Sequence, residues 1–200
     1  MTTAGRPRSV VLVRHGATEW SEAGKHTGRI DLPLIDAGVR QVETLAGALA
    51  EWRFDRVLCS PLQRARMTVA AAGFGDVVEI DPDLQEWDYG EYEGLTIDEI
   101  REQRPGWNIW DDGVTGGESI TDVATRAHRV LDRIREVGGD VALFAHGHLL
   151  RILAACWLGG PPLLAGHLSL STASISVLGW EHDWASIRGW NDTHHLSGLD

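Results

Sequence analysis

Short apolar runs and amphipathic stretches alternate along this chain of 200 residues. Residues 10–13 form an apolar, largely β-branched run that stops abruptly at Arg14-His15-Gly16, which predicts a buried strand. Residues 141–145 form a second such run, and it stops at His146-Gly147-His148. Between and after these runs, apolar residues recur at helical spacing, so the pattern indicates a chain that mixes strands with helices.

The same patterns locate the remaining elements and predict the fold class. We expect strands over residues 10–13, 56–59, 77–80, 141–145, 172–179 and 184–188, the last two as a closing hairpin. We expect helices over residues 36–49, 62–73, 96–105, 119–137 and 148–157, with polar loops over 16–35, 86–94 and 107–118. Strands that alternate with helices predict an α/β fold of three α/β/α layers around a mostly parallel central sheet. Because no linker or repeat interrupts the chain, residues 1–200 should form a single domain.

Charged and imidazole side chains follow the apolar runs at residues 10–13 and 141–145. If the two strands are parallel neighbours, His15 and His146 face one crevice, because such sheets bind ligands at the carboxyl ends of their strands. Arg14 supplies a cation there, and Gly16 and Gly147 allow the backbone to approach a ligand closely. This combination is typical of a phosphate site in which a histidine can attack phosphorus.

Short motifs between residues 14 and 147 together resemble those of one enzyme family. They are Arg14-His15-Gly16, Gly28-x-x-Asp31-x-Pro33-Leu34, Ser60-Pro61-x-x-Arg64-Ala65-x-x-Thr68, Glu86-Trp87-x-Tyr89-Gly90-x-x-Glu93-Gly94, Gly117-Glu118-Ser119 and His146-Gly147. Their composition and order resemble the histidine phosphatase (phosphoglycerate mutase-like) superfamily. The resemblance implies the phosphoglycerate mutase-like fold and an enzyme that forms a phosphohistidine.

The motif residues suggest a division of catalytic roles. His15 is the candidate nucleophile, because a neutral imidazole with one free nitrogen can attack phosphorus. Arg14, Arg64 and His146 are candidate ligands of the transferred phosphoryl oxygens, since phosphoryl transfer depends mainly on positioning and charge neutralisation. Glu86 is the candidate general acid for the leaving alkoxide, and the same carboxylate can later activate water.

A second set of residues is expected to bind substrate around that centre. Ser21 stands where family members commonly carry Asn, but its hydroxyl can still bind phosphate, and Thr27 is an alternative contact. The backbone N–H groups of Gly147 and His148, at a predicted helix N-terminus, are further candidate donors. The expected binding residues are Ser21, Thr27, Gly28, Tyr89, Gly147 and His148. Nearby, Glu93 is expected to order its loop and Glu118 to support the site structurally.

A metal centre is the weaker interpretation of the histidines. His26 and His148 could join His15 and His146 as ligands, but the family motif needs the last two as nucleophile and phosphate ligand. No pair of carboxylates is spaced for a metal ion. We therefore expect neither a metal nor a cofactor.

Composition limits the class of partner. A formal net charge of −11 argues against nucleic acid and an anionic membrane as partners, although clustered cations can still attract a phosphate ester at contact range. No segment is long and apolar enough to cross a bilayer, and residues 1–8 lack an apolar signal region. Cys59 and Cys156 are expected to be reduced core residues. We therefore expect a cytoplasmic protein whose partner is a small phosphate ester, and a homodimer is left open.

Three functions are compatible with these residues: a phosphatase of small phosphate monoesters, a cofactor-dependent phosphoglycerate mutase, and a non-catalytic module that binds phosphate esters. The module is disfavoured, because a candidate nucleophile, acid and phosphate ligands are all present. Mutases of the superfamily carry a long insertion after the position of Gly94. The insertion contains paired arginines and a lysine that bind the substrate carboxylate. In this chain residues 95–117 offer only Arg101 and Arg104 and no lysine, which favours the phosphatase.

Two segments refine the expected substrate. Residues 24–29 and 86–90 resemble most the small acid phosphatases and sugar-bisphosphate phosphatases of the superfamily. The resemblance therefore implies a metal-independent phosphatase that hydrolyses sugar phosphates.

Overall fold

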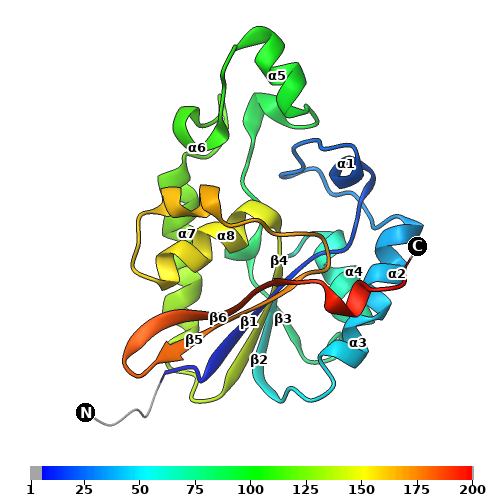
Figure 1. The fold of residues 1–200 in the computed structure, drawn as a ribbon, viewed down its shortest axis with the longest axis vertical. Helices are drawn as coiled ribbons and strands as arrows, with labels where there is room; N and C mark the ends of the chain where they lie inside the picture. Colours follow the sequence, from blue (N-terminus) through cyan, green and yellow to red (C-terminus); the bar gives the residue numbers. More distant parts are fainter. Residues whose placement is uncertain (1–5, 200) are drawn as a thin grey trace.

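A six-stranded sheet forms the centre of the structure, a computed structural model that describes residues 6–199 (Figure 1). The strand order is β3-β2-β4-β1-β5-β6. Strands β1 to β4 pair in parallel, and β5 and β6 add to one edge as an antiparallel hairpin. The strand bounds are Ser9–Arg14 (β1), Phe54–Cys59 (β2), Val78–Ile80 (β3), Asp140–Ala145 (β4), Ile175–Glu181 (β5) and Trp184–Asp192 (β6). The mostly parallel sheet and the closing hairpin are thus confirmed. Part of the N-terminal segment expected to lack a signal, residues 1–5, lies outside the described residues.

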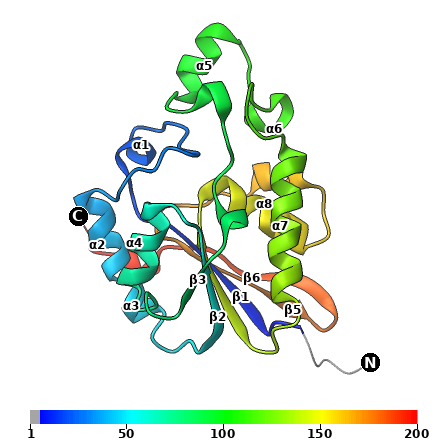
Figure 2. The same cartoon turned by 180° about the vertical axis from the view of Figure 1, so that it is seen from behind.

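Helices cover both faces of the sheet, which gives the predicted three layers (Figures 1 and 2). Helices α7 and α8 lie on one face, and α2, α3 and α4 lie on the other. Short helices α1, α5 and α6 lie beyond the carboxyl ends of the parallel strands. The helix bounds are Glu19–Glu22 (α1), Asp36–Glu43 (α2), Leu45–Ala48 (α3), Gln63–Ala71 (α4), Ile97–Gln103 (α5), Ile109–Asp112 (α6), Ile120–Ile134 (α7) and Gly147–Trp157 (α8). Among residues 6–199, no helix combines the length and hydropathy needed to cross a membrane.

Strand β1 shows why the apolar runs are buried in the core. Successive side chains of a strand point to opposite faces of the sheet. Val10 and Leu12 accordingly pack in the core under α7 and α8, whereas Val11 and Val13 pack in the core under α2, α3 and α4. A strand buried on both faces needs apolar residues at every position, which is the pattern that residues 10–13 show.

The structure adds detail in the loops that sequence periodicity does not resolve. The helix expected over residues 36–49 is divided at Thr44, whose hydroxyl donates to the Gln41 carbonyl. Helices α1 and α6 lie within stretches expected to be loops, and each is only four residues long. An element of one turn has no hydrophobic period to detect, so only its cap residue signals it. Cys59 and Cys156 are buried and unpaired, as expected.

Close backbone packing holds α2 against the loop that follows β1. A Cβ atom added at Gly38 would lie 2.1 Å from the Ala17 carbonyl oxygen, and one added at Gly16 would lie 2.6 Å from the Gly38 carbonyl oxygen. Gly16 and Gly38 therefore permit a contact that no side chain could fit. This contact fixes the backbone immediately after His15.

Replacement of Gly38 by alanine should test this contact. The control is the same replacement at Gly47, a helical glycine with no close neighbour. We expect Gly38→Ala to lower the free energy of unfolding by about 1–3 kcal/mol, because the added methyl forces the backbone to shift. Gly47 lies in α3 and is exposed, and a Cβ atom added there would meet no atom within 4 Å. Gly47→Ala should instead stabilise the protein by about 0.5–1 kcal/mol, since alanine favours helix. Urea unfolding would measure both, and equal effects would contradict the close contact.

Candidate active site

The two histidines that follow β1 and β4 meet at the carboxyl edge of the sheet. Arg14 is paired with Ala145 in the parallel register, and the His15 N–H donates to the Ala145 carbonyl over 3.0 Å. The ring centroids of His15 and His146 are 5.2 Å apart. The two histidines therefore meet as predicted, but His146 is fully buried and does not itself line the cavity at this edge.

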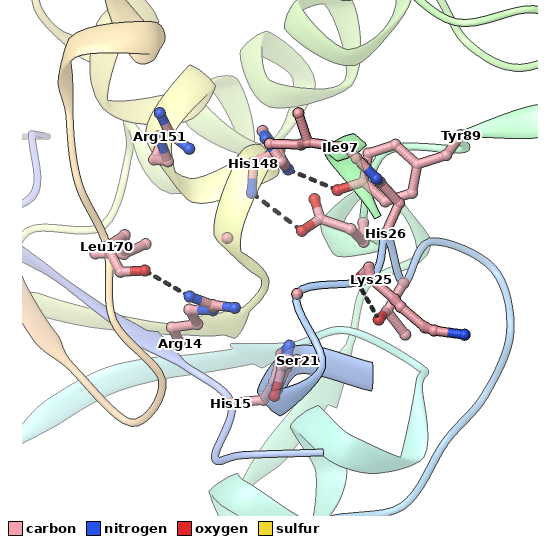
Figure 3. A pocket seen from close by; sticks show the side chains of 14 residues that line it. Arg14, His15, Ser21, Lys25, His26, Tyr89, Ile97, His148, Arg151 and Leu170 are labelled. Carbon is pink, nitrogen blue, oxygen red and sulfur yellow. Dashed lines mark hydrogen bonds between the residues drawn. The ribbon is translucent and has the colours of Figure 1, made fainter. Parts of the chain in front are cut away.

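A cavity of about 210 Å³ opens at this edge (Figure 3). Its wall includes Arg14 and His15 from the end of β1 and the start of α8 at Gly147 and His148. Glu86 and Tyr89 enter from the loop expected over residues 86–94. Cations, imidazoles and a carboxylate therefore share one small space.

His15 is held in one orientation and one tautomer. Its Nδ1 lies 2.7 Å from the carbonyl oxygen of Gly16, which can only accept a hydrogen bond, so Nδ1 carries the proton. Nε2 is then the unprotonated nitrogen of the ring. Burial, aided by the charges of Arg14 and Arg64, lowers the pKa of His15 well below its ordinary value of 6.5. The neutral, nucleophilic form of the imidazole is thereby favoured.

Arg14 presents an unsatisfied donor at the same place. Its Nη1 donates to the Leu170 carbonyl over 2.5 Å, but its Nε has no hydrogen-bond partner although it is buried. Within residues 6–199, it is the sole buried side-chain nitrogen or oxygen in this state. Burial also lowers the pKa of Arg14, since the charge has lost its water. An anion bound in the cavity could accept a hydrogen bond from Nε and could offset the hydration that the buried guanidinium has lost.

Arg64 and His146 lie directly behind the cavity wall and are fully buried. Arg64 Nε donates to His146 Nδ1 over 3.2 Å, and His146 Nε2 donates to the Ser60 hydroxyl over 2.7 Å. The remaining guanidinium nitrogens of Arg64 donate to the carbonyls of Thr27, Gly28 and Ile30. Arg64 therefore braces the loop around Thr27 and adds positive charge close to His15, whereas His146 accepts at Nδ1 as a neutral imidazole and orients the Arg64 guanidinium. Their direct contact with a phosphoryl group stays a prediction.

The Glu86 carboxylate is held by backbone amides at the start of α8. Oε1 accepts from the Trp87 and Leu149 N–H groups over 2.9 Å each, and Oε2 accepts from the His148 N–H over 3.0 Å. The His148 amide, expected to bind substrate, is thus occupied by Glu86. This arrangement suits a helix N-terminus, where amide donors lack intrahelical acceptors. Glu86 is brought into the cavity as predicted, with only 4% of its surface exposed.

A partly buried ion pair between Glu118 and Arg126 supports the loop that carries Glu86. Glu118 accepts from Arg126 Nε over 2.7 Å and from the Asp88 N–H over 3.0 Å. Arg126 also donates to the carbonyls of Asp83, Gln85 and Glu86. Glu93, in turn, accepts from the Gly28 N–H over 2.7 Å. The expected structural roles of Glu118 and Glu93 agree with these contacts.

Most of the expected binding residues line the cavity. They are Ser21, Thr27, Tyr89, Gly147 and His148. The Ser21 hydroxyl already donates to the Thr18 carbonyl in the cap of α1, so it can offer a ligand only an acceptor. Gly28 does not line the cavity: its carbonyl accepts from Arg64, and an added Cβ would lie 2.4 Å from the Trp87 carbonyl oxygen. These contacts therefore support a structural role for Gly28 in place of the predicted substrate contact.

Several residues that line the cavity were not among the expected site residues. They include Lys25, Ile97, Arg151 and Leu170. Arg151 had a detectable signal, because it is the sole Arg, Lys, Asp or Glu in the otherwise largely apolar segment 147–157. A charge in a buried helix needs a partner or a ligand. Leu170 had no such signal, since it contributes through its backbone carbonyl.

The alternative metal site finds no support in the positions of the histidines. His26 Nδ1 pairs with the Leu95 carbonyl at 2.9 Å, and His148 Nδ1 pairs with the Tyr89 hydroxyl at 2.6 Å. In the part of the chain that the structure describes, no three His, Cys, Asp or Glu side chains form a group able to hold a metal ion.

Comparison with known proteins agrees with this geometry. A family model described as the histidine phosphatase superfamily (branch 1) matches residues 10–193. An acid phosphatase of Mycobacterium tuberculosis is 39% identical over 181 residues, which cover 88% of this chain and 89% of the relative. A sedoheptulose 1,7-bisphosphatase of Saccharomyces cerevisiae is 37% identical over 181 residues, covering 74% of this chain and 67% of the relative.

A solved structure shows that the fold is shared as well as the sequence. The product of an open reading frame of Mycobacterium tuberculosis superposes with a TM-score of 0.86 at 37% identity, covering 92% of this chain and 97% of that chain. The region matched by the family model contains almost the whole sheet, both flanking layers and the residues of the cavity. The chain therefore belongs to branch 1 of the histidine phosphatase superfamily and is a phosphoric monoester hydrolase.

Proposed function

We propose that this phosphatase hydrolyses small sugar phosphates through a phosphohistidine on Nε2 of His15, without a metal ion. The observation that carries the proposal is the hydrogen bond of 2.7 Å between His15 Nδ1 and the Gly16 carbonyl. It assigns the proton to Nδ1 and leaves the lone pair of Nε2 free to attack phosphorus. The unsatisfied Nε of Arg14 beside it supports an oxyanion as the ligand.

In the first step, the Nε2 lone pair of His15 forms a bond to phosphorus and the bond from phosphorus to the ester oxygen breaks. The electron pair of that bond remains on the leaving oxygen, which takes a proton from Glu86. Three backbone N–H groups hold the Glu86 carboxyl group in the cavity, so it needs no large movement to donate. Arg14 neutralises charge on the phosphoryl oxygens.

In the second step, water attacks the phosphohistidine. The Glu86 carboxylate takes a proton from that water, the bond from phosphorus to Nε2 breaks, and neutral His15 is restored together with inorganic phosphate. The hydrogen bond to Gly16 keeps the imidazole in one tautomer throughout. One nucleophile and one carboxylate thus serve both halves of the reaction.

The contacts of Arg101 and Arg104 favour a phosphatase over a mutase. Arg101 Nε donates to the Trp107 carbonyl over 3.0 Å, and Arg104 Nη1 donates to the Tyr92 hydroxyl over 2.6 Å. Neither arginine lines the cavity. Since these are the arginines available between residues 95 and 117, this segment offers no clamp for a phosphoglycerate carboxylate, and water can reach the phosphohistidine.

We also propose that the protein acts in the cytoplasm on a free small molecule. Buried, unpaired Cys59 and Cys156 suit a reducing compartment. The net charge of −11 disfavours nucleic acid and anionic membranes as partners.

Substitution of His15 tests the nucleophile directly. We expect His15→Ala to abolish turnover, because no other free imidazole nitrogen replaces Nε2 at the phosphorus. Denaturing quench during turnover should leave base-stable, acid-labile phosphate on the wild type and none on the variant. His128→Ala, at an exposed position on α7, is the matched control and should retain labelling. Equal labelling of His15→Ala and wild type would contradict the assignment.

Substitution of Glu86 tests the proton donor. We expect Glu86→Gln to slow phosphorylation by a sugar phosphate roughly 10²–10⁴-fold, because a basic alkoxide needs a proton on departure. With para-nitrophenyl phosphate the leaving phenolate is stabilised, so the phosphorylation burst should fall much less. Glu136→Gln, at an exposed position, controls for loss of a carboxylate. An equal loss of burst rate with both esters would leave Glu86 a positioning residue.

The pKa of His15 predicts how its charge changes with pH. Burial, then the charges of Arg14 and Arg64, lowers this pKa well below 6.5, so the ring takes up its proton only at a more acidic pH. We expect the NMR signals of the His15 ring in the free enzyme to stay constant from about pH 8 down through 6.5, where a histidine in a reference peptide titrates. A His15 midpoint near that of the peptide would contradict a buried neutral nucleophile.

A further inference from the structure

A residue with a strained backbone lies directly against the backbone of His15. Ala173, in the loop before β5, has a φ of 54°, which is in the left-handed region that residues with a side chain rarely adopt. Ala173 is fully buried and packs in the core under α2, α3 and α4. Such a conformation persists only where the surrounding structure holds it, so contacts with other parts of the chain must hold Ala173.

Both backbone polar groups of Ala173 are hydrogen-bonded, one to each of two histidines. The Ala173 N–H donates to the His15 carbonyl over 3.0 Å, and the Ala173 carbonyl lies 3.0 Å from Nε2 of His195. A carbonyl oxygen can only accept a hydrogen bond, so Nε2 of His195 carries the proton and donates it. Ala173 therefore connects His195 to the residue that carries the nucleophilic ring.

His195 belongs to a short 3-10 turn, η4 (His194–Leu196), that follows β6 (Figure 1). The neighbouring Leu196 packs against the core under α2, α3 and α4, which docks the turn on the same layer as Ala173. Neither His195 nor Ala173 lines the cavity. The turn is thus linked to His15 through backbone hydrogen bonds, without contact with the space that substrate would occupy.

The contact with Ala173 bears on the orientation of the His15 ring. The His15 carbonyl belongs to the peptide group that joins His15 to Gly16, and the Gly16 carbonyl accepts the Nδ1 proton of the ring. On the other side, the Arg14 N–H donates to the Ser174 carbonyl over 3.2 Å. A change in the conformation of Ala173 would therefore displace the backbone both before and after the ring.

Two other described residues with a side chain have a positive φ, and each has a local explanation. His182, with a φ of 53°, is exposed in the turn between β5 and β6, where tight hairpins require this conformation. Asn191, with a φ of 55°, is of a residue type that adopts it readily. Ala173 has neither explanation, because it is buried and its methyl group forms no hydrogen bond. Its conformation therefore depends on its contacts with His15 and His195.

We propose that His195 is a positioning residue of this phosphatase. Its hydrogen bond holds Ala173 in the left-handed conformation, and Ala173 in turn fixes the backbone that orients the His15 ring. The inference rests on the proposed function, since it takes His15 to be the nucleophile. It makes the rate of phosphorylation depend on η4, a segment that touches no substrate.

Removal of the donor tests the inference. We expect His195→Ala to slow the phosphorylation burst with para-nitrophenyl phosphate about 10-fold, because a displaced nucleophile loses its alignment with phosphorus. The ¹⁵N NMR shifts of the His15 ring should move from those of an Nδ1-protonated imidazole toward the average of the two tautomers. His195→Gln, whose amide nitrogen can replace Nε2 as the donor, should restore the burst and the ring shifts at least in part. His194→Ala is the matched control, because His194 is exposed and its ring forms no hydrogen bond among residues 6–199, and it should behave as the wild type.

Ala173→Gly separates positioning from general stability. Glycine adopts the left-handed conformation without strain, so the His195 hydrogen bond should become dispensable in this background. Adding His195→Ala to Ala173→Gly should then slow the burst less than about 3-fold, as a double-mutant cycle would reveal. His182→Gly relieves a similar φ at an exposed hairpin turn and is the control background, in which His195→Ala should still slow the burst about 10-fold.

Two results would overturn the inference: a wild-type burst with unmoved His15 ring shifts in His195→Ala, or an equal loss of burst rate in all three backgrounds. Failure of the proposed function has a different signature, namely that the wild type takes up no phosphate on His15. The ring shifts are measured without substrate, so they would test the role of His195 even then.

Discussion

The parallel pairing of β1 with β4 is the constraint on which the rest of this structure depends. The register that places Arg14 opposite Ala145 brings His15 and His146 to the same edge, with their rings 5.2 Å apart. A slip of one residue would turn every side chain of β1 to the other face of the sheet and would carry Arg14 and His15 out of register with the end of β4. Helix α8 begins directly after β4, and its first amides therefore meet Glu86 in the same space. This strand pairing thus places the candidate nucleophile His15 beside His146 and close to Glu86.

The site concentrates positive charge in a protein whose net charge is −11. It does so by giving its cations neutral partners: the guanidinium groups of Arg14, Arg64 and Arg151 donate to carbonyl oxygens or to a histidine ring nitrogen. The Glu86 side chain is bound by backbone amides and, among the described residues, forms no ion pair with an arginine. Unpaired buried charge costs stability, and that cost is recovered when an oxyanion binds. The arrangement accounts for a local anion site on an anionic protein.

Much of this organisation could be predicted from the sequence, and the remainder could not for physical reasons. The strands at residues 10–13 and 141–145 were predictable because burial on both faces demands continuous apolar runs. His15 was predictable because it follows such a run, and Glu86 because its motif resembles that of the superfamily. The hydrogen bonds of Arg64 were not, since its acceptors are backbone carbonyls from a loop that precedes it by more than thirty residues. The contact of Leu170 with Arg14 was not predictable either, because Leu170 contributes its backbone carbonyl. Helices of a single turn, such as α1, have no hydrophobic period to detect.

The most direct test of the site is a crystal structure of the wild-type protein with vanadate, an oxyanion that can accept a fifth ligand in place of the phosphorus under attack. We predict that vanadium is bonded to Nε2 of His15, that Nδ1 still donates to the Gly16 carbonyl, and that a vanadate oxygen accepts from Nε of Arg14. Vanadate held elsewhere in the cavity, with Nε2 of His15 free of contact and Nε of Arg14 still without an acceptor, would contradict the assignment of His15 as the nucleophile.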